Sequence, residues 1–122
     1  MPDILVVDRD LKSLGAMIPR IHTWAYTFDV AETLQQAIEM LDLHACGIVI
    51  LAVYVDDFDA SDAIATIYQA NPKARIVAVG DRSSLELERA VRLSKIFYYM
   101  IRPIDFDELK AVVSRALEKS IN

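Results

Sequence analysis

Short apolar runs rich in β-branched residues alternate along the chain with longer segments in which apolar residues recur every three or four positions. The short runs are typical of strands buried on both faces, and the longer segments of amphipathic helices. The expected strands are Ile4–Val7, Tyr26–Val30, a run that begins at Gly47 and gives way to an acidic loop at Ala52, Arg75–Val79 and Ile96–Ile101. The pattern therefore predicts five strands, each followed by a helix.

Capping residues and prolines set the expected limits of these helices. The first is expected from Leu11 to Ile18, with Asp10 as its N-cap and Pro19 as the residue that ends or kinks it. Thr33 is the expected cap of the second. The remaining helices are expected over Asp59–Ala70, from a cap at Ser83 through Ser94, and after a capping-box-like start at Asp105–Glu108.

Strands that alternate with helices through short connections predict a parallel sheet with right-handed crossovers and helices on both faces. The expected fold class is therefore α/β, doubly wound, in a single domain over residues 1–122. In such a sheet a site forms where the C-terminal ends of the central strands meet. Those ends are Asp8, Ala52, Gly80 and Ile101–Arg102.

Composition and charge exclude several classes of protein. With 122 residues, 54% of them hydrophobic, the chain is large enough for a core that needs no disulfide or metal. A net charge of −5 argues against nonspecific binding to nucleic acid or anionic membranes. The single Cys46 excludes an internal disulfide, and His22 and His44 are too few for a recognisable zinc site. We expect a soluble, cytoplasmic domain without a signal peptide or membrane span.

Three blocks of the sequence resemble the receiver domains of two-component response regulators, the family of the chemotaxis protein CheY. Ile4–Asp10 resembles the first strand and acidic turn of that family, Ile48–Ala60 its third strand and following loop, and Met100–Asp105 the block that carries its lysine and proline. The blocks lie in register over essentially the whole chain. The resemblance implies a CheY-like, flavodoxin-like (βα)5 fold with a five-stranded parallel sheet of order 2-1-3-4-5.

The resemblance also implies a reaction, phosphoryl transfer to an aspartate at the end of the third strand, assisted by Mg²⁺, a hydroxyl and a lysine. This sequence departs from the family at most of the matching positions. Ala52 stands at the phosphoacceptor position, Arg9 at the second acidic position, Gly80 at the hydroxyl position and Arg102 at the lysine position, while Asp8 keeps the first acidic position. Because a methyl group cannot attack phosphorus, we expect a degenerate receiver, or pseudo-receiver, that is not an enzyme.

Two expectations concern the altered pocket. A hard dication needs several anionic oxygens, so Arg9 and Ala52 in place of two acids predict weak or absent Mg²⁺ binding, and no other cofactor is expected. Arg102 or Arg9 is expected to form an ion pair with Asp8 where the metal would stand. The alternatives are purely structural: Ala52 packs beneath the loop, Asp8 is a turn carboxylate, and Gly80 is a turn glycine.

Two adjacent aromatic residues on the expected fifth strand suggest an interaction surface. Tyr99 matches the switch aromatic of the family, and Tyr98 lies beside it. Aromatic residues on strands most often only pack. Alternatively, they form with Leu85, Leu93 and the last helix the face that receivers commonly use to dimerise or contact targets. The expected partners are a protein, a cognate output domain or a second copy of the chain, with no nucleic acid and no membrane.

Two other functions remain as alternatives. Asp56 and Asp57, four and five residues after Ala52, are alternative acceptors for off-site phosphorylation. A flavodoxin-like nucleotide or flavin binder is the other alternative, although no Gly-rich phosphate loop follows any strand. The leading hypothesis is a receiver-like module of a two-component phosphorelay that acts by protein contact or dimerisation, either alone or joined to an output domain.

Overall fold

The computed structural model describes residues 2–54, 60–81 and 85–121. These residues form five strands, β1 (Ile4–Val7), β2 (Phe28–Ala31), β3 (Ile48–Ala52), β4 (Arg75–Gly80) and β5 (Tyr98–Ile101). They alternate with five helices, α1 (Leu11–His22), α2 (Leu34–Leu43), α3 (Ala60–Ala70), α4 (Leu85–Leu93) and α5 (Phe106–Ile121). All strand pairs are parallel, and the sheet order is β2-β1-β3-β4-β5. The expected doubly wound α/β fold with order 2-1-3-4-5 is confirmed.

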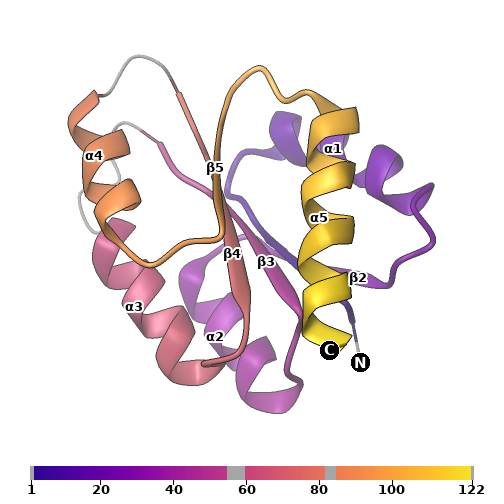
Figure 1. Ribbon diagram of the computed structural model, residues 1–122, viewed down its shortest axis with the longest axis horizontal. Coiled ribbons are helices and arrows are strands. Elements are labelled where there is room, and N and C mark those ends of the chain that lie inside the picture. The colour runs from indigo at the N-terminus through magenta and orange to yellow at the C-terminus, as the bar shows by residue number, and fades with distance from the viewer. Residues whose placement is uncertain (1, 55–59, 82–84, 122) are drawn as a thin grey trace.

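Helices cover both faces of the sheet, α1 and α5 on one face and α2, α3 and α4 on the other (Figure 1). Each face has its own hydrophobic core, which includes Met17 under the first pair and Ile64 under the second group. β3 contributes to both cores, since Ile50 belongs to the first and Leu51 to the second. Successive side chains of a strand point to opposite faces, so a central strand covered on both sides is apolar throughout.

Helix α1 continues through Pro19 and ends at His22, so the expected end of the first helix at Ile18 is wrong. A proline inside a helix removes one hydrogen bond and crowds the preceding turn, at a cost of about 3 kcal/mol or more. Met17 before the proline and Ile21 after it are both buried on the apolar face of the helix. Continuing the helix therefore buries another large side chain, and we attribute the tolerance of the proline to this packing.

Strands β2 and β5 each begin two residues later than the sequence pattern suggested. β2 begins at Phe28 and not at Tyr26, because its ladder with β1 starts with the pair Ile4 and Phe28. Tyr26 instead packs against the core under α1 and α5. β5 begins at Tyr98 and not at Ile96.

The helix starts follow the capping residues where these are described. Asp10 and Thr33 each accept a hydrogen bond from a backbone N–H of the following turn, and Asp105 accepts two. These three expected caps are confirmed, whereas the expected cap at Ser83 and the expected helix start at Asp59 lie outside the described residues. In the described ranges, every helix is too short or too polar to cross a membrane.

Candidate functional site

Four residues that the sequence singled out lie at the C-terminal ends of adjacent strands. Asp8 follows β1, Ala52 ends β3, Gly80 ends β4 and Arg102 follows β5. Because β1 pairs with β3, β3 with β4 and β4 with β5, these ends lie side by side at one end of the sheet. The backbone N–H of Arg102 donates to the carbonyl of Gly80 at 2.8 Å, which extends the ladder to this point. The structure thus brings all four residues together at one end of the sheet, and these residues define what we call the strand-end pocket.

Asp8 is held by hydrogen bonds and not by an arginine. The residue is only 2% exposed. Its Oδ1 accepts from the hydroxyl of Tyr54 at 2.5 Å and from the backbone N–H of Asp10 at 3.0 Å, while its buried Oδ2 has no hydrogen-bond partner in the described part of the chain. Among the described residues, neither Arg9 nor Arg102 forms an ion pair with this carboxylate. The expected ion pair with Asp8 is therefore wrong.

Tyr54, two residues after the end of β3, occupies the pocket instead. Besides donating its hydroxyl to Asp8, it lies under two guanidinium groups. The central carbon of Arg9 is 4.9 Å from the centre of its ring, and that of Arg102 is 4.3 Å away. Such distances are typical of cation–π contacts. A single aromatic side chain thereby contacts the buried carboxylate and both arginines.

The surroundings of Tyr54 keep its hydroxyl protonated. Burial is the main cause, and the hydrogen bond to Asp8 and the negative charge of that residue add to it, so that the pKa of Tyr54 is raised to about 12. Sequence reasoning missed this residue. In an extended strand, residues two apart point to the same side, so the spacing from Ala52 was the signal that could have placed Tyr54 in the pocket.

Arg102 pairs with Asp81, a second residue that sequence reasoning missed. Its Nη1 donates to Oδ1 of Asp81 at 3.1 Å and to the carbonyl of Val53 at 3.1 Å. Its Nε and Nη2 are buried without a hydrogen-bond partner among the described residues. Asp81 directly follows β4 and keeps 38% of its side chain exposed, so pairing it with an arginine requires less desolvation than pairing the buried Asp8.

These residues do not suit the magnesium ion that the receiver resemblance implies. Mg²⁺ prefers hard oxygen ligands in an octahedral arrangement. One oxygen of Asp8 is engaged by Tyr54, and the described residues contain no group of three or more His, Cys, Asp or Glu side chains that could hold a metal. Ala52 is half-buried and offers a methyl group, which is neither a ligand nor a nucleophile. The alternative acceptors Asp56 and Asp57 lie outside the described residues.

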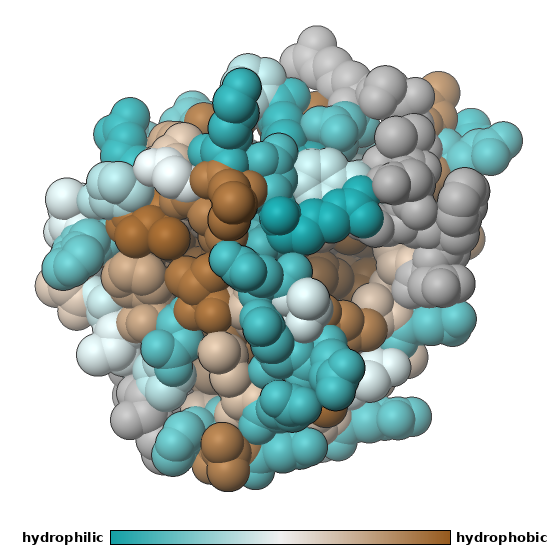
Figure 2. All heavy atoms as spheres, turned by 180° about the vertical axis from the view of Figure 1, so that it is seen from behind, coloured by the Kyte–Doolittle hydropathy of each residue, from teal (hydrophilic) through white to brown (hydrophobic). Residues whose placement is uncertain are grey.

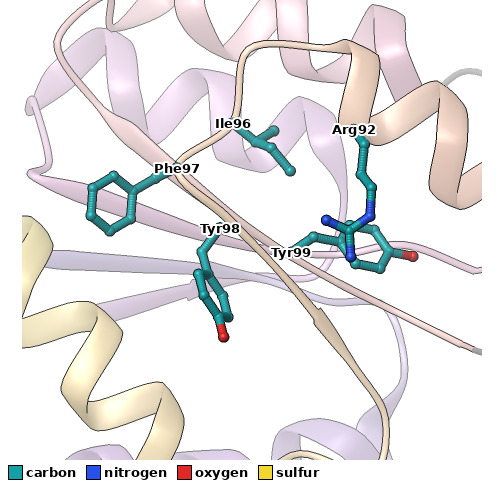
Figure 3. Close-up of a pocket in the computed structure, with 5 residues that line it drawn as sticks. All are labelled: Arg92, Ile96, Phe97, Tyr98 and Tyr99. Carbon is teal, nitrogen blue, oxygen red and sulfur yellow. The ribbon is translucent and has the colours of Figure 1, made fainter.

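A second feature is an open hollow of about 410 Å³ on the surface formed by α4, β5 and α5. Arg92 and the consecutive residues Ile96–Tyr99 line it (Figure 3). The rings of Tyr98 and Tyr99 point in different directions from the strand. Tyr98 donates its hydroxyl to Glu108 on α5, whereas the ring of Tyr99 lies 4.8 Å from the central guanidinium carbon of Arg92.

The four residues expected to form an interaction face differ in exposure. Leu85 and Leu93, at the two ends of α4, are 65% and 89% exposed. Tyr98 is half-buried, and Tyr99 is only 8% exposed. Tyr99 therefore contributes to this surface as part of the lining of the hollow and not as a projecting side chain.

Exposed leucines alone do not distinguish the α4–β5–α5 surface from the rest of the molecule. Leu11 on α1 and Leu43 on α2 are also 70% and 76% exposed. Figure 2, which shows the molecule from the side opposite to Figure 1, has several small groups of hydrophobic residues separated by hydrophilic ones. The α4–β5–α5 surface also carries the hollow, with its aromatic lining and its arginine.

Comparison of the sequence with known proteins gives distant but extended matches. No family model matches the chain. The transcriptional regulatory protein ZraR of Escherichia coli K12 is 28% identical over 115 residues, which are 94% of this chain and 26% of ZraR. The transcriptional regulatory protein GlrR of the same strain is 24% identical over 117 residues. The chain spans about a quarter of the length of these curated relatives.

Solved structures match the fold over nearly the whole chain. The signal receiver domain of an HD domain-containing protein from Pseudomonas fluorescens Pf-5 superposes with a TM-score of 0.85 at 26% identity, covering 97% of this chain and 95% of that one. A response regulator receiver domain protein from Clostridium thermocellum superposes with a TM-score of 0.84 at 14% identity, covering 98% and 97%. In sequence and in fold, the chain is therefore similar to receiver (CheY-like) domains of response regulators.

Proposed function

We propose that this chain is a degenerate receiver of a two-component system, which acts through protein contacts and is not phosphorylated at the usual position, Ala52. The observation that carries the proposal is the position of Tyr54 in the strand-end pocket, where its hydroxyl engages Asp8 and its ring contacts two arginines. The pocket is thus occupied by the chain's own side chains at the place where a receiver performs its chemistry.

Aspartyl phosphorylation requires a carboxylate that attacks phosphorus and a metal ion that neutralises the phosphoryl oxygens. Ala52 cannot supply the first. The guanidinium groups of Arg9 and Arg102 lie over the ring of Tyr54, close to the only acidic residue kept from the family pattern, and their charges oppose the binding of a second cation. The pocket therefore lacks the attacking carboxylate and disfavours the metal ion, so neither requirement of aspartyl phosphorylation is met there.

A domain without chemistry of its own has to act by binding. We propose the α4–β5–α5 surface as the contact site, because it combines the hollow with the exposed Leu85 and Leu93. Its partner is a protein, a cognate output domain or a second copy of the chain. The relative ZraR, a transcriptional regulatory protein of which the match covers 26%, supports a module that works beside an output domain in the cytoplasm. With a net charge of −5, the module itself is not the nucleic-acid-binding part.

Phosphorylation is tested by incubating the purified chain with acetyl phosphate and Mg²⁺ and measuring its intact mass, beside a receiver that has its aspartate. We expect no gain of a phosphoryl group. A gain that disappears in Asp56→Asn or Asp57→Asn would replace this proposal with off-site phosphorylation. A flavodoxin-like flavin binder would instead show visible absorption in the purified protein.

Contact through the surface is tested by sedimentation of the chain over a range of concentrations, with Leu93→Glu and Leu43→Glu as matched variants. Both leucines are highly exposed, so neither change should disturb folding, but only Leu93 lies on α4. Loss of a dimer in Leu93→Glu alone supports self-association through this surface. A dimer that survives Leu93→Glu and dissociates in Leu43→Glu contradicts the assignment of the surface.

A further inference from the structure

Tyr99 is turned into the molecule although its hydroxyl finds no partner there. The residue is 8% exposed and belongs to the core under α2, α3 and α4. Its hydroxyl is buried and has no hydrogen-bond partner among the described residues. Leaving a buried hydroxyl unpaired is unfavourable, so hydrogen bonding does not explain this orientation.

Gly80 at the end of β4 provides the space that the hydroxyl occupies. An ideal Cβ built on Gly80 would lie 2.1 Å from Oη of Tyr99 and 2.9 Å from its Cζ. Real Cβ atoms essentially never approach other atoms so closely, so a side chain at position 80 would displace the ring. The backbone of Gly80 does not have a positive φ, so conformation does not demand a glycine here. The glycine is instead explained by the space that the Tyr99 hydroxyl needs.

Gly80 also borders the strand-end pocket. Its carbonyl accepts the backbone N–H of Arg102 at 2.8 Å, and Cγ2 of Val53 would lie 3.3 Å from the same Cβ. The carbonyl of Val53 is in turn a partner of the Arg102 guanidinium. Position 80 therefore adjoins both Tyr99 and the strand-end pocket, and a glycine places no side chain there that could move between them.

Arg92 closes the other side of the ring. Its guanidinium group lies beside the ring of Tyr99 (Figure 3), with the central carbon 4.8 Å from the ring centre. Nη2 of Arg92 also lies 3.6 Å from Oε1 of Glu88, one turn earlier on α4. The ring of Tyr99 is thus held between Gly80, which has no side chain, and Arg92, which lines the hollow. Any displacement of the ring away from Gly80 would change the lining of the hollow.

We propose that Gly80 is a positioning residue for the α4–β5–α5 surface. Because Gly80 leaves space for the Tyr99 hydroxyl, it keeps the hollow in one shape, whatever the state of the strand-end pocket. The use of that surface for contact rests on the function proposed above. The geometric part of the inference, that Gly80 fixes Tyr99 independently of the pocket, does not.

The geometric part is tested by a double-mutant cycle in urea. Gly80→Ala should lower the denaturation midpoint in the wild-type background and lower it far less in a Tyr99→Leu background, where no ring meets the new methyl group. Gly15→Ala is the matched control, because a Cβ on Gly15 has no atom within 4 Å. An equal loss from Gly80→Ala in both backgrounds would overturn the assignment.

Tyrosine nitration mapped by peptide mass spectrometry supplies a readout specific to Tyr99. We expect Tyr99 to resist nitration in the wild type, in Gly15→Ala and in Tyr54→Phe, which disturbs only the pocket, and to react several times faster in Gly80→Ala. Equal protection of Tyr99 in Gly80→Ala, or its exposure by Tyr54→Phe, would refute the proposal. Neither experiment involves a phosphodonor or a partner, so either outcome is independent of the phosphorylation and sedimentation tests.

Discussion

Replacing Tyr54 by phenylalanine removes a single hydroxyl group from the strand-end pocket. That hydroxyl donates to Oδ1 of Asp8 at 2.5 Å, and Asp8 is 2% exposed. The ring remains, so the contacts with the guanidinium groups of Arg9 and Arg102 are retained. The substitution therefore isolates one hydrogen bond to a buried carboxylate.

The expected loss of stability depends on the hydrogen bonds that Asp8 retains in the variant. A hydrogen bond to a charged group contributes about 1.5–3 kcal/mol to stability, and an acceptor left buried without its donor adds to the loss. In Tyr54→Phe the backbone N–H of Asp10 still donates to Oδ1, and among the described residues Oδ2 has no donor even in the wild type. We expect the free energy of unfolding to fall by about 2 kcal/mol, which for a domain of this size lowers Tm by roughly 6–10 °C.

Urea denaturation near neutral pH, followed by circular dichroism, measures this loss. An unchanged m-value, the slope of the free energy of unfolding against urea concentration, would show that the folded state is intact. Tyr98→Phe is the matched control, because it removes a hydroxyl that donates to Glu108 on the exposed surface, and it should cost clearly less. If Tyr54→Phe unfolds at the same urea concentration as the wild type, the hydrogen bond to Asp8 does not stabilise the pocket, and the argument that Tyr54 occupies it fails.

Three further results are expected. Because the pKa of Tyr54 is raised to about 12 from 10.0, the stabilisation by its protonated form is complete below pH 10 and is lost as the pH rises towards 12, so urea midpoints above about pH 10 should fall more steeply in the wild type than in Tyr54→Phe. Ala52→Asp alone should gain no phosphoryl group from acetyl phosphate and Mg²⁺, whereas its combination with Arg9→Asp and Tyr54→Ala should gain one by intact mass. Phosphorylation of the single variant would show that the missing carboxylate alone silences the pocket. Pro19→Ala should raise the free energy of unfolding by about 1–3 kcal/mol, because it restores a helical N–H; an unchanged thermal midpoint would indicate that α1 is adapted to the proline.

Those parts of the structure that depend on local patterns could be predicted from the sequence. The alternation of apolar strands with amphipathic helices determined the fold class, and residues such as Thr33 and Asp105 marked helix starts through bonds to their own following turns. Parallel strands bring their C-terminal ends to the same end of the sheet whatever the side chains are, so Asp8, Ala52 and Gly80 could be assigned to one pocket.

What only the tertiary structure decided is which side chain meets which within that pocket. Tyr54 reaches Asp8 across 46 positions of sequence, and Arg102 reaches the carbonyl of Val53 across 49. Several donors near Asp8 were chemically plausible, and the choice among them depends on differences of a few ångströms that exist only once the strands are in register. The same holds for the turn of Tyr99 towards Gly80, since nothing in the local sequence records the empty space beside a glycine on the neighbouring strand.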